Sequence, residues 1–201
     1  MGKFKDNPLV ISTGFGIGIV SYLFLINEIL YQHPNRTVIL FETPFVNLHP
    51  TASKQETVLE VDTMFSQLNI KKCTWVGHSF GTIAAGWVVQ HRPHYISKLI
   101  LVDYICFRMW DTASYRALLY QTPDLLEAAM IQILFSSDST VAYAIGRHIY
   151  WFDCLLFPEQ IVMPTKFSLP PMTSSSPPLG LAPTSNIALP KTTCLTSTSP
   201  P

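Results

Sequence analysis

Apolar and polar stretches alternate along the chain in a way that predicts strands separated by helices. Short apolar runs suited to strands buried on both faces occur at residues 9–11, 37–41, 73–76 and 99–102. Ser53 and Glu56 form a capping-box pattern, and apolar residues at helical spacing follow it at Val58, Val61, Phe65 and Leu68. Another helix is expected to end before Pro93. This order predicts an α/β fold, with a mostly parallel sheet and helices on its faces.

The stretch from residue 8 to residue 27 has two interpretations. It holds 20 residues without a charge, which is about the length needed to span a bilayer and would make the protein membrane-anchored. It also divides into a strand, a turn at Gly14 and Gly16, and a helix over residues 17–30. The dinucleotide pattern G-x-G-x-x-G fails here, because its last position falls on Ile19 or Ser21. We therefore expect no nucleotide cofactor, and no other cofactor is indicated.

Charge and cysteine content narrow the class of protein further. The 201 residues carry 13 Lys and Arg against 13 Asp and Glu, so the chain lacks the basic excess that nucleic-acid binding needs. The 4 cysteines are scattered without a C-x-x-C pair, which indicates a reducing, cytoplasmic location inside the cell rather than a disulfide framework. The low charge leaves peripheral membrane contact open. The oligomeric state is not indicated.

Composition changes sharply near residue 166. All 13 acidic residues lie at or before Glu159, whereas the 36 residues from Lys166 onward include 8 Pro, 7 Ser and 6 Thr. Such a stretch buries too little apolar surface to offset its conformational entropy. We therefore expect a folded domain over residues 1–165 and a disordered tail over residues 166–201.

The strongest chemical motif is Gly77-His78-Ser79-Phe80-Gly81. It is a G-x-S-x-G sequence between a predicted strand and a predicted helix, the context in which this motif forms a sharp turn that exposes the serine. The glycines at Gly77 and Gly81 avoid Cβ clashes in that turn. We expect Ser79 to act as a nucleophile, and the backbone N–H of Phe80 to stabilise an oxyanion at the start of the helix.

On these residues the chain resembles the α/β-hydrolase family of the AB hydrolase-1 type. Residues 76–82 (VGHSFGT) look like the family's nucleophile elbow, and residues 12–18 (STGFGIG) look like the oxyanion loop that follows its third strand. Thr13 stands where the family usually has histidine, and the Phe15 backbone N–H would be the second oxyanion donor. The resemblance implies a helical lid over residues 104–157.

The resemblance also shows what the sequence lacks. The family sheet normally has eight strands, and this chain would begin at the third and stop on entering the seventh, near residues 161–169. The usual acid and the histidine after the eighth strand are not present, since no histidine follows His148. We expect an incomplete product whose reading frame or splice site departs near Lys166.

Substitute catalytic residues follow from the family order of nucleophile, acid and base. Asp103, at the end of the predicted strand 99–102, would be the acid, and His148 in the lid would be the base. Both also have structural interpretations, Asp103 as a strand-end cap and His148 as a packed ring. His78 is expected to pack beside the elbow. His91 and His94 flank Pro93, but no metal site is expected there.

The sequence thus predicts a serine hydrolase acting on a small ester-like substrate with an apolar acyl group. Two alternatives remain open at this point. One is a catalytically inactive remnant that binds an apolar ligand or a partner. The other is a protein anchored in a membrane through residues 8–27.

Overall fold

The structure is a computed structural model that describes residues 7–14, 18–42, 53–107, 109–110 and 150–168. Within these residues five strands form one sheet in the order β2-β1-β3-β4-β5. All four strand pairings are parallel. The strands are β1 (Leu9–Ser12), β2 (Val38–Phe41), β3 (Cys73–His78), β4 (Ile96–Val102) and β5 (Thr165–Ser168). The predicted α/β class with a mostly parallel sheet is confirmed.

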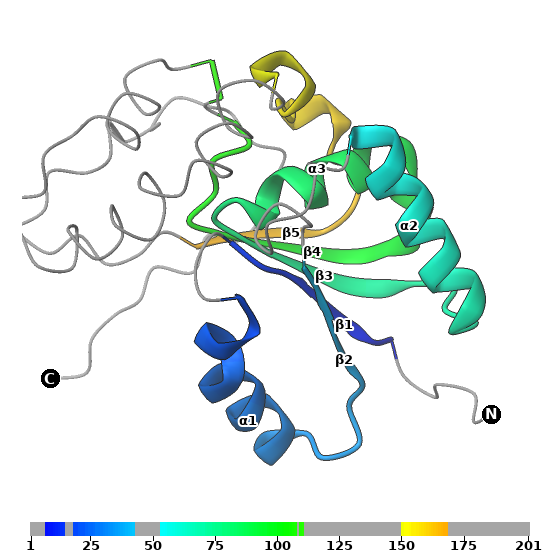
Figure 1. Ribbon diagram of the computed structural model, residues 1–201, viewed down its shortest axis with the longest axis vertical. Helices are drawn as coiled ribbons and strands as arrows, with labels where there is room; N and C mark the ends of the chain where they lie inside the picture. Colours follow the sequence, from blue (N-terminus) through cyan, green and yellow to red (C-terminus); the bar gives the residue numbers. More distant parts are fainter. Residues whose placement is uncertain (1–6, 15–17, 43–52, 108, 111–149, 169–201) are drawn as a thin grey trace, which may run out of the picture.

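Helices cover both faces of this sheet. Figure 1 shows α1 (Leu23–Gln32) on one face, and α2 (Lys54–Gln67) and α3 (Gly81–His91) on the other. A 3-10 helix, η1 (Gly18–Tyr22), leads directly into α1. The described residues also form the 3-10 turns η3 (Pro93–Tyr95), η4 (Trp151–Asp153) and η5 (Pro158–Gln160).

The uncharged stretch from residue 8 to residue 27 is not a single helix. Its first part is β1, which pairs with β2 on one side and with β3 on the other. From Gly18 onward it forms η1 and the start of α1. Among the described helices, none has the length and apolar character needed to cross a membrane. A single helix over residues 8–27, which the membrane-spanning interpretation needs, is excluded because Leu9–Ser12 form a strand.

The capping box predicted before α2 is present. The Glu56 backbone N–H donates to Ser53 Oγ at 3.3 Å, and the Ser53 N–H donates to the Glu56 carboxylate at 2.7 Å. This reciprocal pair satisfies backbone donors that a helix start leaves unpaired. Val58, Val61 and Phe65 are buried, as their spacing predicts.

The main core lies between the sheet and the layer formed by α2 and α3. Trp75, Leu99 and Leu101 are fully buried on this face of the sheet. The helix α3 is buried from Gly81 to Val89, because α2 packs on one side of it and residues 105–107, 109 and 154–156 pack on another. A helix that is apolar all round is typical of such an enclosed position.

The sheet extends further along the chain than the composition predicts. β5 includes residues 166–168, which belong to the stretch whose composition predicts a tail and to the range 161–169 that resembles entry into a further strand. The strand forms because Thr165 is buried and Phe167 packs against the core, while Lys166 and Ser168 alternate outward. The rest of the predicted tail, and residues 111–149 of the predicted lid, lie outside the described residues.

The cysteines of the described core are thiols. Cys73, Cys106 and Cys154 are buried and unpaired. Burial raises the pKa of each of them to about 12, because an apolar environment disfavours the thiolate. They are therefore structural side chains with little nucleophilic character.

Candidate active site

The turn between β3 and α3 has the geometry that a G-x-S-x-G sequence predicts. β3 ends at His78 and α3 begins at Gly81, so Ser79 and Phe80 alone make the connection. Ser79 has φ of 50°, a left-handed conformation that non-glycine residues seldom adopt. Strained residues of this kind are found disproportionately at functional sites. Phe80 is the N-cap of α3, so its N–H lies at the positive end of the helix dipole.

The two glycines of the motif are required by close approaches of the backbone. A Cβ on Gly81 would lie 2.2 Å from the carbonyl oxygen of Ser12, a backbone atom that has no freedom to move away. A Cβ on Gly77 would lie 3.0 Å from the Cα of Thr82. The absence of side chains at these positions lets α3 start directly against the ends of β1 and β3.

The segment after β1 packs directly against the elbow. A Cβ on Gly14 would lie 2.9 Å from Ser79 Cβ and 3.2 Å from His78 Nδ1. The two glycine-containing segments singled out in the sequence therefore lie side by side at the carboxyl end of the sheet. This is the edge at which ligands bind in open α/β sheets.

A buried side-chain network fixes the end of β1. Ser12 Oγ donates to the carbonyl oxygen of Gly81 at 2.7 Å and accepts from Trp75 Nε1 at 2.9 Å. All three residues are buried. The hydrogen bonds hold the first residue of α3 against β1 and so fix the position of the turn that carries Ser79.

A second network joins η1 to the residue before Ser79. The Gly14 N–H donates to Tyr22 Oη at 2.8 Å, and Tyr22 Oη lies 2.6 Å from His78 Nδ1. Burial raises the pKa of Tyr22, which keeps its hydroxyl protonated. Burial lowers the pKa of His78, with partial opposition from the charge of Asp103. His78 is thus held as the neutral imidazole.

These protonation states determine the direction of the hydrogen bond. Tyr22 Oη already accepts a hydrogen bond from the Gly14 N–H, so its own hydroxyl proton is available to donate to His78 Nδ1. We therefore assign His78 Nδ1 as the acceptor. The remaining ring proton of His78 then lies on Nε2. With Nδ1 occupied, His78 positions the loop after β1 and is not placed as a base through that nitrogen.

Asp103 leaves the sheet beside Ser79. His78 and Val102 are paired across β3 and β4, and the Ser79 N–H donates to the Val102 carbonyl at 2.9 Å. Asp103 has φ of 47°, so Ser79 after β3 and Asp103 after β4 both adopt the left-handed conformation where their strands end. The Asp103 N–H donates to the Ser168 carbonyl at 3.0 Å. The structure therefore brings Asp103 to the same edge as Ser79.

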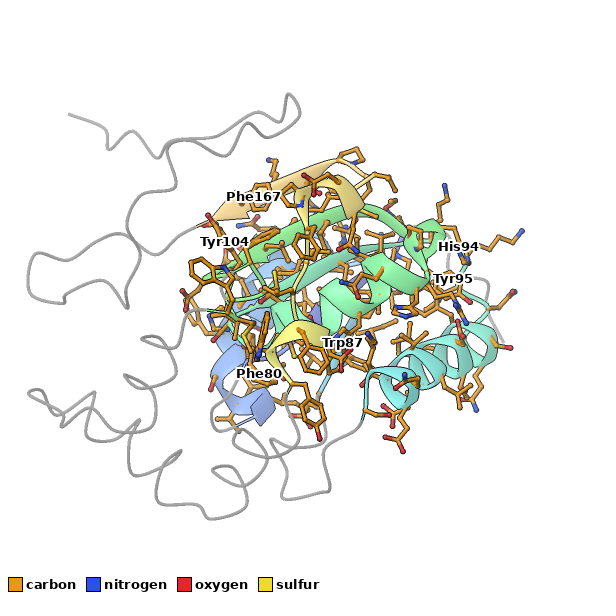
Figure 2. The ribbon with its side chains drawn as sticks, turned by 90° about the horizontal axis from the view of Figure 1, so that it is seen from above. Phe80, Trp87, His94, Tyr95, Tyr104 and Phe167 are labelled. Atoms are coloured by element: carbon orange, nitrogen blue, oxygen red, sulfur yellow. The ribbon has the colours of Figure 1, made fainter. Side chains whose placement is uncertain are left out.

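Two of the site residues predicted from the sequence cannot be placed relative to this edge. Phe15 and His148 lie outside the described residues. His91 and His94 lie near the opposite end of the sheet, where His91 Nδ1 contacts the Trp87 carbonyl and His94 packs on Tyr95. Figure 2 shows His94 and Tyr95 far from Tyr104, which follows β4 at the elbow's end. Within the described ranges, no three metal-binding side chains converge.

Sequence reasoning missed Tyr22 and the buried role of Ser12. Tyr22 lies 56 positions from His78, and no motif or periodicity links the two. The sequence marks Ser12 only as the first residue of the predicted loop at residues 12–18. Its contacts with Trp75 and Gly81 depend on the pairing of β1 with β3, which the sequence pattern did not specify.

Comparison with known proteins finds similar folds among solved structures. Neither a family model nor a curated protein matches the sequence. Similar solved structures include a carboxylesterase from the thaumarchaeon Nitrososphaera gargenis, at TM-score 0.53 and 16% identity over 84% of this chain and 74% of that one. Another is the enol-lactonase of Burkholderia xenovorans LB400, at TM-score 0.54 and 14% identity over 83% and 74%.

A putative epoxide hydrolase from Klebsiella pneumoniae is similar to the same degree, at TM-score 0.53 and 12% identity over 82% of this chain and 74% of that one. The chain thus spans about three quarters of the length of these proteins. At such identities the likeness concerns the fold. The chain has the α/β-hydrolase fold.

Proposed function

We propose that the chain is a serine hydrolase of the AB hydrolase-1 type, acting on a small ester-like substrate with an apolar acyl group. The observation that carries this proposal is the conformation of Ser79. Its φ of 50° at the junction of β3 and α3 is the geometry that raises a serine above the carboxyl edge of a parallel sheet. A strand-to-helix connection without chemical function has no need of this strain.

The proposed chemistry begins with the attack of Ser79 Oγ on the substrate carbonyl. The resulting oxyanion would be bound by the backbone N–H groups of Phe80 and Phe15. Gly14 is not a third donor in this scheme, because its N–H is committed to Tyr22 Oη. Collapse of this intermediate would break the substrate's bond to its alcohol, which leaves with the proton taken from Ser79 Oγ, and water would then hydrolyse the remaining serine ester to release the acid.

Asp103 and His148 complete the proposal as acid and base. Asp103 is supported by its place directly after β4. The last residue of that strand, Val102, pairs with His78, the residue before Ser79. His148 is proposed from the order of residues alone. In this scheme His148 removes the proton of Ser79 Oγ, and Asp103 orients the imidazole and stabilises its charged form.

An apolar substrate fits the surroundings of the elbow. Phe80 and Ile83 at the start of α3 belong to a buried apolar cluster with Met109 and Cys154, which lie near the two ends of the predicted lid. Figure 2 shows Phe80 and Trp87 on the face of the sheet that this cluster covers. The solved structures with this fold include a carboxylesterase and an enol-lactonase, whose names refer to ester substrates.

Hydrolysis of p-nitrophenyl butyrate and octanoate by the parent chain and by Ser79→Ala tests the proposal. The expected loss is about 10³-fold or more in kcat/KM. Ser66→Ala is the matched control, because Ser66 is an exposed serine on α2. Equal hydrolysis by the parent and Ser79→Ala would contradict the proposal.

A second candidate is a binding protein with this fold and no catalysis. It is favoured by one observation: within the described residues, no histidine is hydrogen-bonded to Ser79, and His78 Nδ1 is engaged by Tyr22. Parent protein that is folded by circular dichroism, binds the octanoate ester and leaves it intact would support this candidate.

A further inference from the structure

The helix α1 has apolar side chains on two opposite sides. Ile26 and Ile29 pack inward against Leu9 and Ile11 of β1. Phe24 and Tyr31 are each 83% exposed on the outside. Together with Val20 of the preceding η1, the exposed residues Leu23, Phe24, Leu30 and Tyr31 form a surface that we call the outer face of α1. A helix that is apolar all round is normally enclosed by protein on both sides.

The sheet beside α1 also lacks a covering element among the described residues. The apolar cluster under α1 includes residues of β1, β2 and β3 but none of β4 or β5. Strand alternation places five residues of β4 and β5 on this same face, which we call the β4–β5 strip: Lys98, Ile100, Val102, Lys166 and Ser168. All are partly or fully exposed. Parallel sheets are normally covered on both faces.

We propose that a second copy of this chain covers both surfaces, with α1 of each protomer lying on the β4–β5 strip of its partner. The two helices would lie side by side between the two sheets, related by a twofold axis. Each α1 would then contact its own sheet through Ile26 and Ile29 and the partner's sheet through its outer face. This arrangement pairs the same two surfaces twice, as an isologous interface requires.

Charge complementarity supports this occupant. Glu28 is the one charged residue between Gly18 and Gln32. Its carboxylate accepts a hydrogen bond from Gln32 Nε2 within α1 at 2.6 Å, which leaves further acceptor capacity. The charged residues of the β4–β5 strip are Lys98 and Lys166. One negative charge on the helix therefore meets two positive charges on the strip.

The shape of the surface favours a helix over a flat membrane. A membrane would contact the outer face of α1, but the β4–β5 strip lies deeper by about one helix diameter, ~10 Å. A helix of the partner fills that depth. Phe24 and Tyr31 of two protomers, at ~150–250 Å² for each ring, would bury on the order of 600–1,000 Å². The aliphatic residues and the strip add to this, towards the ~1,200–2,000 Å² of a stable interface.

Sedimentation velocity of the full chain over a concentration series tests the proposal. We expect a dimer in the parent and a loss of about 100-fold or more in dimer affinity for Phe24→Glu, which places a charge at the centre of the interface. Leu59→Glu is the matched control, because Leu59 is 66% exposed on α2 at the other face of the sheet. It should remain dimeric.

A second test, which does not involve Phe24, reverses the charges on α1 and on the β4–β5 strip. Glu28→Lys and the pair Lys98→Glu with Lys166→Glu should each weaken the dimer by about tenfold or more, since each creates like-charge contacts. Combining all three substitutions should restore it. A monomeric parent would overturn the proposal, as would a dimer that none of these variants weakens. Parent that is monomeric and binds phosphatidylcholine vesicles through Phe24 would assign the surface to a membrane instead.

Discussion

Tyr22 Oη lies 2.6 Å from His78 Nδ1 and ties η1 to the residue immediately before Ser79. Because Tyr22 Oη also accepts a hydrogen bond from the Gly14 N–H, this one hydroxyl links η1 both to Gly14 after β1 and to the elbow. The backbone around Ser79 is therefore held by side chains on both flanks, Tyr22 on one and Ser12 on the other.

Lowering the pH should destabilise the folded protein because His78 is buried. Burial lowers the pKa of His78 in the folded chain, so the unfolded chain binds the proton more readily. The free energy of unfolding should therefore decrease as the pH falls below the unfolded histidine pKa of about 6.5, and level off below the folded value. Urea unfolding between pH 8 and pH 5 measures this.

His78→Gln should flatten that dependence, because it removes the titrating group that faces Tyr22 and Asp103. His94→Gln is the matched control, since His94 is exposed near the opposite end of the sheet, and it should keep the parent's slope. An unchanged slope in His78→Gln would contradict the buried, neutral state assigned to His78.

Gly81→Ala should destabilise the protein by about 3 kcal/mol. Its Cβ would lie 2.2 Å from the Ser12 carbonyl oxygen, so β1 and α3 must separate. Gly86→Ala is the contrasting variant on the same helix. There the new Cβ meets Leu156 at an ordinary 3.6 Å, and replacing a helical glycine should stabilise by up to about 1 kcal/mol. Chemical denaturation measures the free energy of unfolding of both variants. Equal changes in Gly81→Ala and Gly86→Ala would contradict the described packing.

The order of strands and helices followed from the sequence because each element there has a strong local signal. The capping box at Ser53 and the G-x-S-x-G motif around Ser79 are examples in which neighbouring residues determine the geometry. β5 was only partly recognised, because Lys166 and Ser168 are polar and the strand depends on pairing with β4.

The long-range contacts of the site had no comparable signal. The bond between Tyr22 and His78 depends on how η1 packs over the end of β3, and the bond between Ser12 and Trp75 depends on strand register. Such contacts are set by tertiary structure, which composition and periodicity do not encode. The roles of Phe15 and His148 remain predictions.

The buried cysteines provide a test of whether the described core is formed. With pKa values of about 12, Cys73, Cys106 and Cys154 should react with iodoacetamide at least about 100-fold more slowly in the native chain than in urea. Mass spectrometry of tryptic peptides measures the rate at each site. Rapid labelling of all three under native conditions would show that the core between the sheet and α3 is open.

Labelling by a fluorophosphonate probe, with the modified residue identified by mass spectrometry, tests whether Ser79 is an activated nucleophile. We expect the folded chain to be modified at Ser79, Ser79→Ala to remain unmodified, and Ser66→Ala to be modified like the parent. A folded chain whose Ser79 does not react would contradict the proposed hydrolase and leave a binding protein with the α/β-hydrolase fold.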